Sequence, residues 1–599
     1  MAVPIFKSKV FKVILIVLAV LAVLLLVATL GANTFLKPIL VSKLKKSVRK
    51  ATNNLYKIDL KDVQLNVFAG SIGLADITFK ADTNVFKILK EQNNAPTSLY
   101  TVEAGRVSVS GAKALKYIFS KEVSVQQVSI GDAIVKIDKL SNKTGTKEND
   151  KRTLYQKIKD DIKFIDIGGI ELNDLQFNYA DRTGKSPSAS VIKHIDIKAA
   201  DLLIDSATQA DTSRTLFCKN ITAGIKNYEG KSASGLYTYK LQSLTLHTQA
   251  SKLVATGLSL QPLPSAQYFK KSKEDRFDIR LDTVVINKIN LEQYYKQNSF
   301  SALSIVIKQG RFEVFSNPNG LVPVTDRLVT FPHWAVRQIK QRVKVDTVYL
   351  KNINVKYKEY HKKSKKTGSI AFTNTTARFL NITNNKNALS KNNICKAYVH
   401  SQFMGKASFN LWFDFNLNDA DYKYAYRGHL GAIDLKAVNP AVMPLGMVQI
   451  TSGNLKSLDF KVTSTQKVSA GSLKFLYNDL KIKLLGQDDK KGYKQKSLLS
   501  FFASSLILKS NNPDKAGEAA RVATLKIIRP SNFPFFKTIW FTLLNGIKTS
   551  AMGKAPKQDE QDKEKRLKEK EKADKKARKQ KEKEDKEFRK KLEKLKNKN

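Results

Sequence analysis

Apolar and polar residues alternate along most of the chain, from Tyr56 to about Ile528. The longest clean run contains apolar residues at every second position from Phe409 to Leu417. Successive side chains of a strand point to opposite faces, so this pattern predicts strands with one apolar and one polar face. Strands of this kind are typical of an antiparallel sheet.

A more specific pattern recurs in four segments, in which apolar pairs two residues apart are separated by a step of three. These segments start at Val123, Ile165, Ile279 and Val343. At each step of three, either a turn reverses the chain or a β-bulge returns the apolar residues to the same face. The irregular spacing of the four starts argues against a regular solenoid or propeller and favours a long meander.

Helical spacing is confined to a few segments. The expected helices are Lys37–Asn54, Ala81–Gln92, Leu154–Lys163, His333–Gln341 and Ala437–Met443. The first of them is basic, with Leu44 and Val48 at helical spacing. It could lie on a membrane surface with its lysines near phosphates, or pack as a linker helix.

Val13–Leu30 is an uncharged stretch of 18 residues. As a helix it would be about 27 Å long, close to the roughly 30 Å of a bilayer's hydrocarbon core. It predicts a membrane anchor whose lipid contacts include Val13, Leu18 and Leu25. The alternative is a cleaved signal peptide, although the apolar region of such peptides is usually only about 7–15 residues long.

The strongest apolar cluster outside that stretch is Phe533–Ile547. Phe536, Trp540 and Leu544 fall on one helical face, where they are candidates for membrane contact. The segment is too short to span a bilayer easily. Three interpretations remain open: an interfacial helix, a lid over one end of the sheet, or a core helix.

The formal net charge of +51 implies anionic partners, such as phospholipid headgroups, glycolipids or nucleic acid. Nucleic acid is disfavoured because the body is dominated by strands and has no recognisable nucleic-acid-binding module. The tail from Lys554 consists almost wholly of Lys, Glu, Asp and Arg. It is expected to be a solvated helical or disordered extension, with binding to anionic lipid or cell-wall polymer as the alternative.

No pattern of catalytic or metal-ligating residues is present in the sequence. The six histidines are scattered, and there is no phosphate-binding glycine loop, metalloprotease motif or serine-nucleophile motif. We therefore expect no enzymatic activity, no cofactor and no metal. Cys218 and Cys395 are too few for a disulfide framework, which leaves one bridge or two buried thiols.

Three features together resemble the AsmA-like group of bacterial envelope proteins, which includes the TamB-like members. They are Tyr56–Phe79 directly after the anchor, the repeated unit described above, and Gly428–Leu485, which is similar to the C-terminal part of these proteins. The resemblance covers about residues 30–530. It implies an inner-membrane anchor with the body in the periplasm, although nearby positive charges alone would favour a cytoplasmic body.

The resemblance further implies that the sheet curls lengthwise into an apolar groove. Such proteins are thought to carry lipids between membranes or to support outer-membrane assembly, and no catalytic residue carries over. The expected partners are membrane phospholipids and an outer-membrane or other envelope protein. The alternative from the residues alone is a closed β-core, which would make the protein a structural tether or assembly scaffold.

The expected fold is mainly β: an N-terminal transmembrane helix, an elongated and curled antiparallel sheet, few short helices and a charged tail. The expected divisions are an anchor (1–35), a basic helix (36–55), the groove body (56–530), an apolar amphipathic helix (531–553) and the tail (554–599). The candidates for the groove lining are Val125, Ile130, Ile167, Leu172, Phe177, Leu281, Ile286, Val345, Leu350, Phe413 and Phe415.

Overall fold

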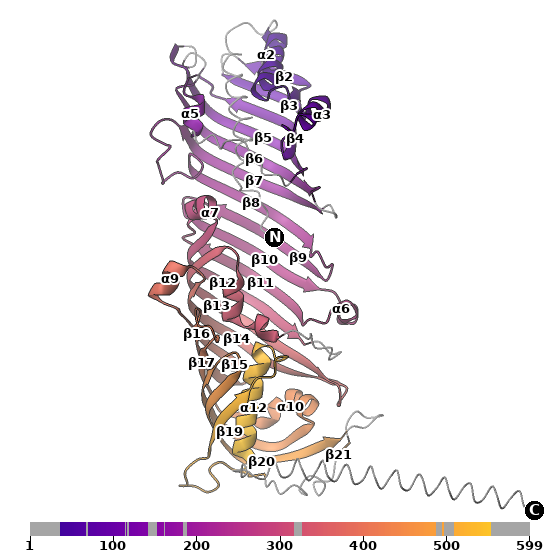
Figure 1. Ribbon diagram of the computed structural model, residues 1–599, viewed down its shortest axis with the longest axis vertical. Coiled ribbons are helices and arrows are strands. Elements are labelled where there is room, and N and C mark those ends of the chain that lie inside the picture. Colours follow the sequence, from indigo (N-terminus) through magenta and orange to yellow (C-terminus); the bar gives the residue numbers. More distant parts are fainter. Residues whose placement is uncertain are drawn as a thin grey trace, which may run out of the picture.

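A computed structural model of the chain describes residues 36–66, 70–113, 116, 119–141, 153–160, 162–183, 188–316, 326–486, 494–495 and 508–552. The fold is mainly β, with 22 strands joined edge to edge in one sheet. The strands lie across the long axis of the molecule and follow one another along it (Figure 1). The predicted anchor, with Val13, Leu18 and Leu25, and the charged tail lie outside the described residues.

Strands β1 to β8 build the N-terminal part of the sheet. Near this edge β3 pairs with β1, β2 and β4, and each later strand pairs with the next one along the chain. Their bounds are β1 (Tyr56–Asp59), β2 (Asp62–Asn66), β3 (Ser71–Ala81), β4 (Ser98–Ser110), β5 (Glu122–Lys139), β6 (Phe164–Asp181), β7 (Ser188–Ile204) and β8 (Cys218–Lys231).

The middle and C-terminal strands continue in chain order. Near the C-terminal edge β17 and β18 both pair with β19, and β20 pairs with β22 and, over two residue pairs, with β21. Their bounds are β9 (Tyr237–His247), β10 (Lys252–Pro262), β11 (Arg276–Asn287), β12 (Ser299–Phe315), β13 (Arg342–His361), β14 (Lys366–Thr383), β15 (Ile394–Phe403), β16 (Ala407–Asn416), β17 (Tyr424–Leu430), β18 (Ile433–Asp434), β19 (Val448–Ser464), β20 (Val468–Gly486), β21 (Lys494–Gln495) and β22 (Val522–Ile528).

The sheet is mixed, which corrects the expectation of a purely antiparallel one. The pairs β5–β6 and β12–β13 are parallel. Parallel neighbouring strands need a crossover connection, because the chain must return to the end of the sheet where the first strand began before it starts the second strand. Helix α5 (Leu154–Ile158) lies in the first crossover, and η3 (Arg327–Thr330) and α8 (Pro332–Gln338) lie in the second.

Steps of three in β6 and β13 are β-bulges, because the strand register shifts there, between Leu172 and Leu175 and between Leu350 and Ile353. The third repeated segment runs past the end of β11. Residues with left-handed φ occur inside the strands, among them Asp132 in β5, Asp174 in β6 and Asn352 in β13. Such residues are typical of bulges, which bend and twist a strand. In β5, Val128 and Ala133 are both buried although their positions differ by five, and Asp132 with its left-handed φ lies between them.

All five expected helical segments contain helix. They correspond to α2 (Leu36–Ala51), α3 (Thr83–Glu91), the shorter α5, α8, and η4 (Leu435–Val438) followed by α10 (Asn439–Gly446). The apolar segment near the C-terminus forms α12 (Phe535–Met552). Not predicted were α6 (Ser265–Lys271), α7 (Leu291–Gln297) and α9 (Lys386–Lys391), which are short connections between strands.

Two hydrophobic cores lie at opposite ends of the sheet. The N-terminal core is built on β1–β8, and side chains of α2, α3 and α5 pack into or against it. The C-terminal core includes side chains of β15–β20 and β22, with α12 and the η3–α8 segment on top. Among the described residues, no helix is long and apolar enough to cross a membrane.

Candidate functional site

The strands between the two cores carry continuous rows of aliphatic side chains on one face. One row pairs Leu253 of β10 with Ile286 of β11, Ile305 of β12 and Val348 of β13. Residues paired directly across neighbouring strands project to the same face of a sheet. The row therefore presents four large aliphatic side chains side by side, and all four are only partly buried.

A second row runs parallel to the first, two residues along each strand. It pairs Ala255 with Val284, Ile307 and Leu350. Ala255 is buried, and the other three side chains are partly exposed. We call the surface formed by these two rows on β10–β13 the open apolar face.

The open apolar face is continuous with both cores. Toward the N-terminus the face continues from its second row through Leu244 of β9 to Ile225 of β8, which packs against the N-terminal core. Toward the C-terminus it continues through Phe379 of β14 to Ala397 of β15, a member of the C-terminal core. One apolar surface thus runs from one end of the sheet to the other.

In the part of the chain that the structure describes, the middle of this surface differs from its ends because no second layer of side chains closes it. Among the described residues, none from β9–β13 belongs to either hydrophobic core. The neighbouring helices lie at the strand ends: α6 packs its Phe269 against Phe315, and α7 leads into the start of β12 (Figure 1). An apolar sheet face normally needs a second layer to cover it.

The opposite face of the same strands is largely polar. Lys308 pairs with Lys351, and Arg280 pairs with Arg311, which gives this face four exposed cations. Val254, Val285 and Val306 form a single aliphatic row among them. The two faces are therefore chemically distinct, and only one of them is continuous with the cores.

Seven of the eleven predicted groove residues lie in the cores or against them. Phe177 is 3% exposed and Phe415 is 4% exposed, so their immediate neighbours are other protein side chains. The seven are Val125, Ile130, Ile167, Leu172 and Phe177 in the N-terminal part, and Phe413 and Phe415 in the C-terminal part.

The remaining four lie between the cores. Ile286 and Leu350 belong to the open apolar face, and Leu281 lies beside it in β11 and is also partly exposed. Val345, at the start of β13, is buried at 3% exposure but is in neither core. Ile305 and Ile307 complete the face and were not chosen from the sequence, although their own alternation in β12 was visible there.

Helix α12 packs on the C-terminal core with small residues and with the large apolar residues Phe535, Ile539, Leu543 and Ile547. Thr538, Thr542 and Gly546, at intervals of four, are buried. A Cβ at Gly546 would come within 2.8 Å of Leu525, so the helix lies close against β22. Phe536 is 59% exposed.

The other two candidates for membrane contact on α12, Trp540 and Leu544, are partly exposed. The helix is therefore packed on the C-terminal core by one side, with its predicted contact face directed outward. Whether that face meets a membrane stays a prediction.

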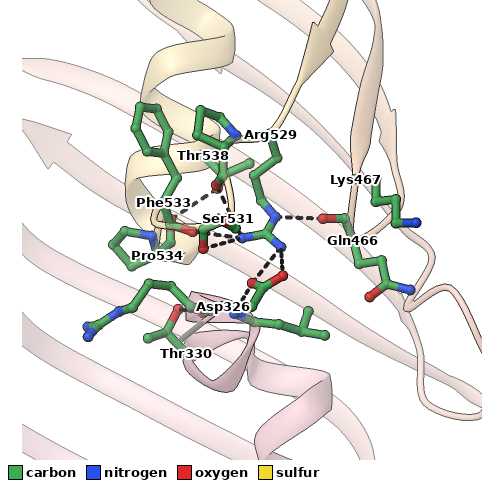
Figure 2. A network of polar contacts seen from close by, with 12 residues as sticks. Asp326, Thr330, Gln466, Lys467, Arg529, Ser531, Phe533, Pro534 and Thr538 are labelled. Carbon is green, nitrogen blue, oxygen red and sulfur yellow. Dashed lines mark hydrogen bonds and ion pairs between the residues drawn. The ribbon is translucent and has the colours of Figure 1, made fainter. Parts of the chain in front are cut away.

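A buried arginine fixes the start of α12 to two distant parts of the chain. Arg529, 8% exposed, donates to both carboxylate oxygens of Asp326 at 2.7 and 2.9 Å. It also donates to the backbone oxygens of Gln466 and Ser531 (Figure 2). The contacts join the β19–β20 turn, the η3 segment and the residues before α12.

The two cysteines are buried inside the protein. Cys218 and Cys395 are free thiols, and burial raises the pKa of each to about 12. They are thus protonated and unreactive at neutral pH. Within the part of the chain that the structure describes, no group of three or more His, Cys, Asp or Glu side chains could hold a metal ion.

No protein-family model matches the chain. No curated protein matches it either.

Proposed function

We propose that this chain binds lipid acyl chains along the open apolar face and helps to transfer phospholipids between membranes or to support outer-membrane assembly. The observation that carries the proposal is the pair of aliphatic rows across β10–β13, in which all side chains except the buried Ala255 are partly exposed. Covering apolar surface with hydrocarbon is favourable by roughly 25 cal/mol per Å² removed from water. A lipid tail would provide the second layer that these strands lack.

The arrangement suits movement as well as binding. Neighbouring positions on the face are all aliphatic, so a tail shifted by one strand, about 4.8 Å, would meet a chemically similar surface. Binding sites of similar affinity have low barriers between them. Charged headgroups would remain at the strand ends, where the high positive charge of the chain favours phosphate.

The resemblance to AsmA-like proteins supports the cellular setting of this proposal. It is carried by Tyr56–Phe79, the repeated unit and Gly428–Leu485, and these segments form strands of the long sheet. On this basis we propose an inner-membrane anchor in residues 1–35, a body in the periplasm, and an envelope protein as partner. The proposal includes no catalytic step, no cofactor and no metal.

A structural tether is the second candidate function. The two packed cores favour it, because a rigid sheet closed at both ends is suited to holding two partners at a fixed separation. In that case the open apolar face would be covered by protein rather than by lipid.

Lipid copurification tests the proposal with a matched pair of variants. Ile305 belongs to the open apolar face, whereas Val306, the next residue of β12, projects to the opposite face; both are partly exposed. We expect the wild-type full chain and V306D to retain phospholipid through purification, as measured by mass spectrometry. I305D should lose most of it, because a carboxylate on the face would be desolvated by a bound tail.

The result that contradicts lipid binding is equally definite. If the wild-type chain carries no phospholipid, or if I305D and V306D carry equal amounts, the face does not hold lipid tails. Thermal unfolding of the three proteins controls for folding, since both substitutions are at partly exposed positions and should cost similar stability.

A further inference from the structure

A basic cleft lies at the N-terminal end of the sheet, between α2 and the turn that joins β1 to β2. It has a volume of about 710 Å³. That is within the range of roughly 300–1,000 Å³ found for ligand pockets. Four cations line it: Lys45, Lys46 and Arg49 from α2, and Lys61 from the turn.

Two of the four cations are already paired with carboxylates. Lys45 contacts Asp59 at 2.9 Å, and Lys61 contacts Asp76 at 3.7 Å. Within the described residues, Lys46 and Arg49 have no ion-pair partner within 4.0 Å, and both are exposed. They are therefore available to an anion that enters the cleft.

One acidic residue, Asp62, also lines the cleft. Its carboxylate accepts a hydrogen bond from the Val63 backbone N–H at 2.8 Å and a longer one from Gln64. These bonds engage the carboxylate locally, and the four cations outnumber it. The cleft therefore favours a negatively charged ligand.

Apart from Ser42, the rest of the lining is apolar. Val41, Leu60 and Val63 line the cleft, and all three belong to the N-terminal core or pack against it. Cations beside an aliphatic wall match a ligand that has a phosphate next to hydrocarbon. No aromatic ring is among the described residues that line the cleft, so nothing there would stack on a nucleic-acid base.

We infer that this cleft binds the phosphate of a phospholipid, with the proximal part of an acyl chain against its apolar wall. The inference rests on the proposed function and adds a headgroup site at the end of the sheet that follows the predicted anchor. Lys46 and Arg49 would bind the phosphate oxygens, and arginine can do so through two parallel hydrogen bonds. A lipid held there would be positioned where the apolar surface of the sheet begins.

The test uses the full chain and three soluble phosphate compounds: dihexanoyl phosphatidic acid, glycerol 3-phosphate and inorganic phosphate. The variant K46Q/R49Q removes the two unpaired cations. K50Q is the matched control, because Lys50 is an exposed residue of the same helix that does not line the cleft. Binding is measured by calorimetric titration of each protein with each compound.

We expect the wild-type chain to bind dihexanoyl phosphatidic acid at least about tenfold more tightly than glycerol 3-phosphate or inorganic phosphate. K46Q/R49Q should lose at least about tenfold in affinity, since hydrogen bonds to charged groups are among the stronger ones, and K50Q should lose none. If inorganic phosphate binds as tightly as dihexanoyl phosphatidic acid, the cleft is a site for free phosphate and the inferred lipid ligand is wrong. If none of the three compounds binds, or if K46Q/R49Q and K50Q lose affinity equally, the inferred anion site in the cleft is wrong.

Lipid copurification on the same proteins separates this inference from the proposed function. If K46Q/R49Q behaves like K50Q in the titration while wild-type protein still carries phospholipid, the inferred headgroup site in the cleft is wrong. The proposal that the open apolar face binds lipid then remains. If wild-type protein carries no phospholipid at all, the proposed function is wrong whatever binds at the cleft.

Discussion

At the scale of single residues, His333 shows how the C-terminal core sets the chemistry of a buried group. The side chain is 1% exposed, and its ring lies against Phe331, Phe415 and Tyr424. Its Nε2 is 2.9 Å from the backbone oxygen of Tyr422, which can only accept, so Nε2 carries the proton. Sequence reasoning noted this histidine only as one of six scattered ones.

His333 predicts a loss of stability on acidification. Burial, with a smaller effect of Arg337, lowers its pKa from 6.5 to about 4, although the hydrogen bond to Tyr422 opposes this. Between these two values the unfolded chain binds a proton that the folded chain excludes, so the stability is present above pH 6.5 and lost as pH falls. The loss should approach about 3 kcal/mol near pH 4.

The measurement compares urea unfolding of wild-type protein and H333Q at about pH 7 and about pH 4.5. Glutamine can still donate to the Tyr422 oxygen but does not titrate in this range. The wild-type protein should lose more stability than H333Q on acidification. Equal losses in the two proteins would show that His333 is not held neutral.

Arg529 predicts how firmly α12 is attached. R529M keeps most of the side-chain length but removes the guanidinium that donates to Asp326 and to four backbone oxygens. Removing one partner of a fully buried ion pair typically costs about 3–5 kcal/mol, and the loss should be smaller here because the Asp326 side chain is 49% exposed. We expect faster hydrogen exchange and proteolysis in α12, with little change in β5–β8. K526M, at an exposed position of β22, is the control, and equal exchange in both variants would contradict the role of Arg529.

At the scale of elements, the bulges explain how far the sequence could predict the strands. The apolar pattern placed most strands and all five expected helical segments, because periodicity depends only on which side of an element is buried. It could not decide between a turn and a bulge at the steps of three, because both return apolar residues to one face. The pattern of a single strand also carries no information about its neighbour, which is why the parallel pairs β5–β6 and β12–β13 were missed.

The left-handed backbone of Asn352 predicts that a β-branched residue at this bulge would destabilise the folded protein. It lies within β13, has φ of 57° and is exposed. N352V should destabilise the protein by about 1–2 kcal/mol, because a β-branched residue is strained in the left-handed region. N352G should be neutral or slightly stabilising. Thermal unfolding of the two variants checks this, and equal midpoints would show that the bulge does not persist in solution.

At the scale of the whole molecule, the two ends of the sheet are built differently from its middle. β1 and β2 lie end to end along β3, and the pairs β17 and β18 and β21 and β22 likewise share one neighbour each, so the 22 strands form 19 rows. At about 4.8 Å per row the sheet is about 90 Å long before twist is considered. Helices from the crossovers and from the C-terminal segment cover the apolar face near the ends, and β10–β13 lack such a layer among the described residues. The protein therefore combines two stable cores with an apolar surface between them.

This division explains why the candidate site could be predicted only in part. Val125, Phe177 and Phe413 have the same alternating pattern as Ile286 and Leu350. Which of them is closed off depends on helices that fold back from elsewhere in the chain, such as α5 and α12. Periodicity reports the apolar face of a strand and cannot report what covers it.

The most direct test of the central claim is site-specific photocrosslinking to lipid in cells. A benzophenone amino acid at Ile305 or Leu350 would lie on the open apolar face, and one at Val306 or Lys351 on the opposite face of the same strands. After irradiation in cells that contain labelled fatty acids, we predict labelled adducts at the first two positions and at neither of the others. Equal labelling on both faces, or labelling on neither, would contradict an apolar surface that carries lipid between the two cores.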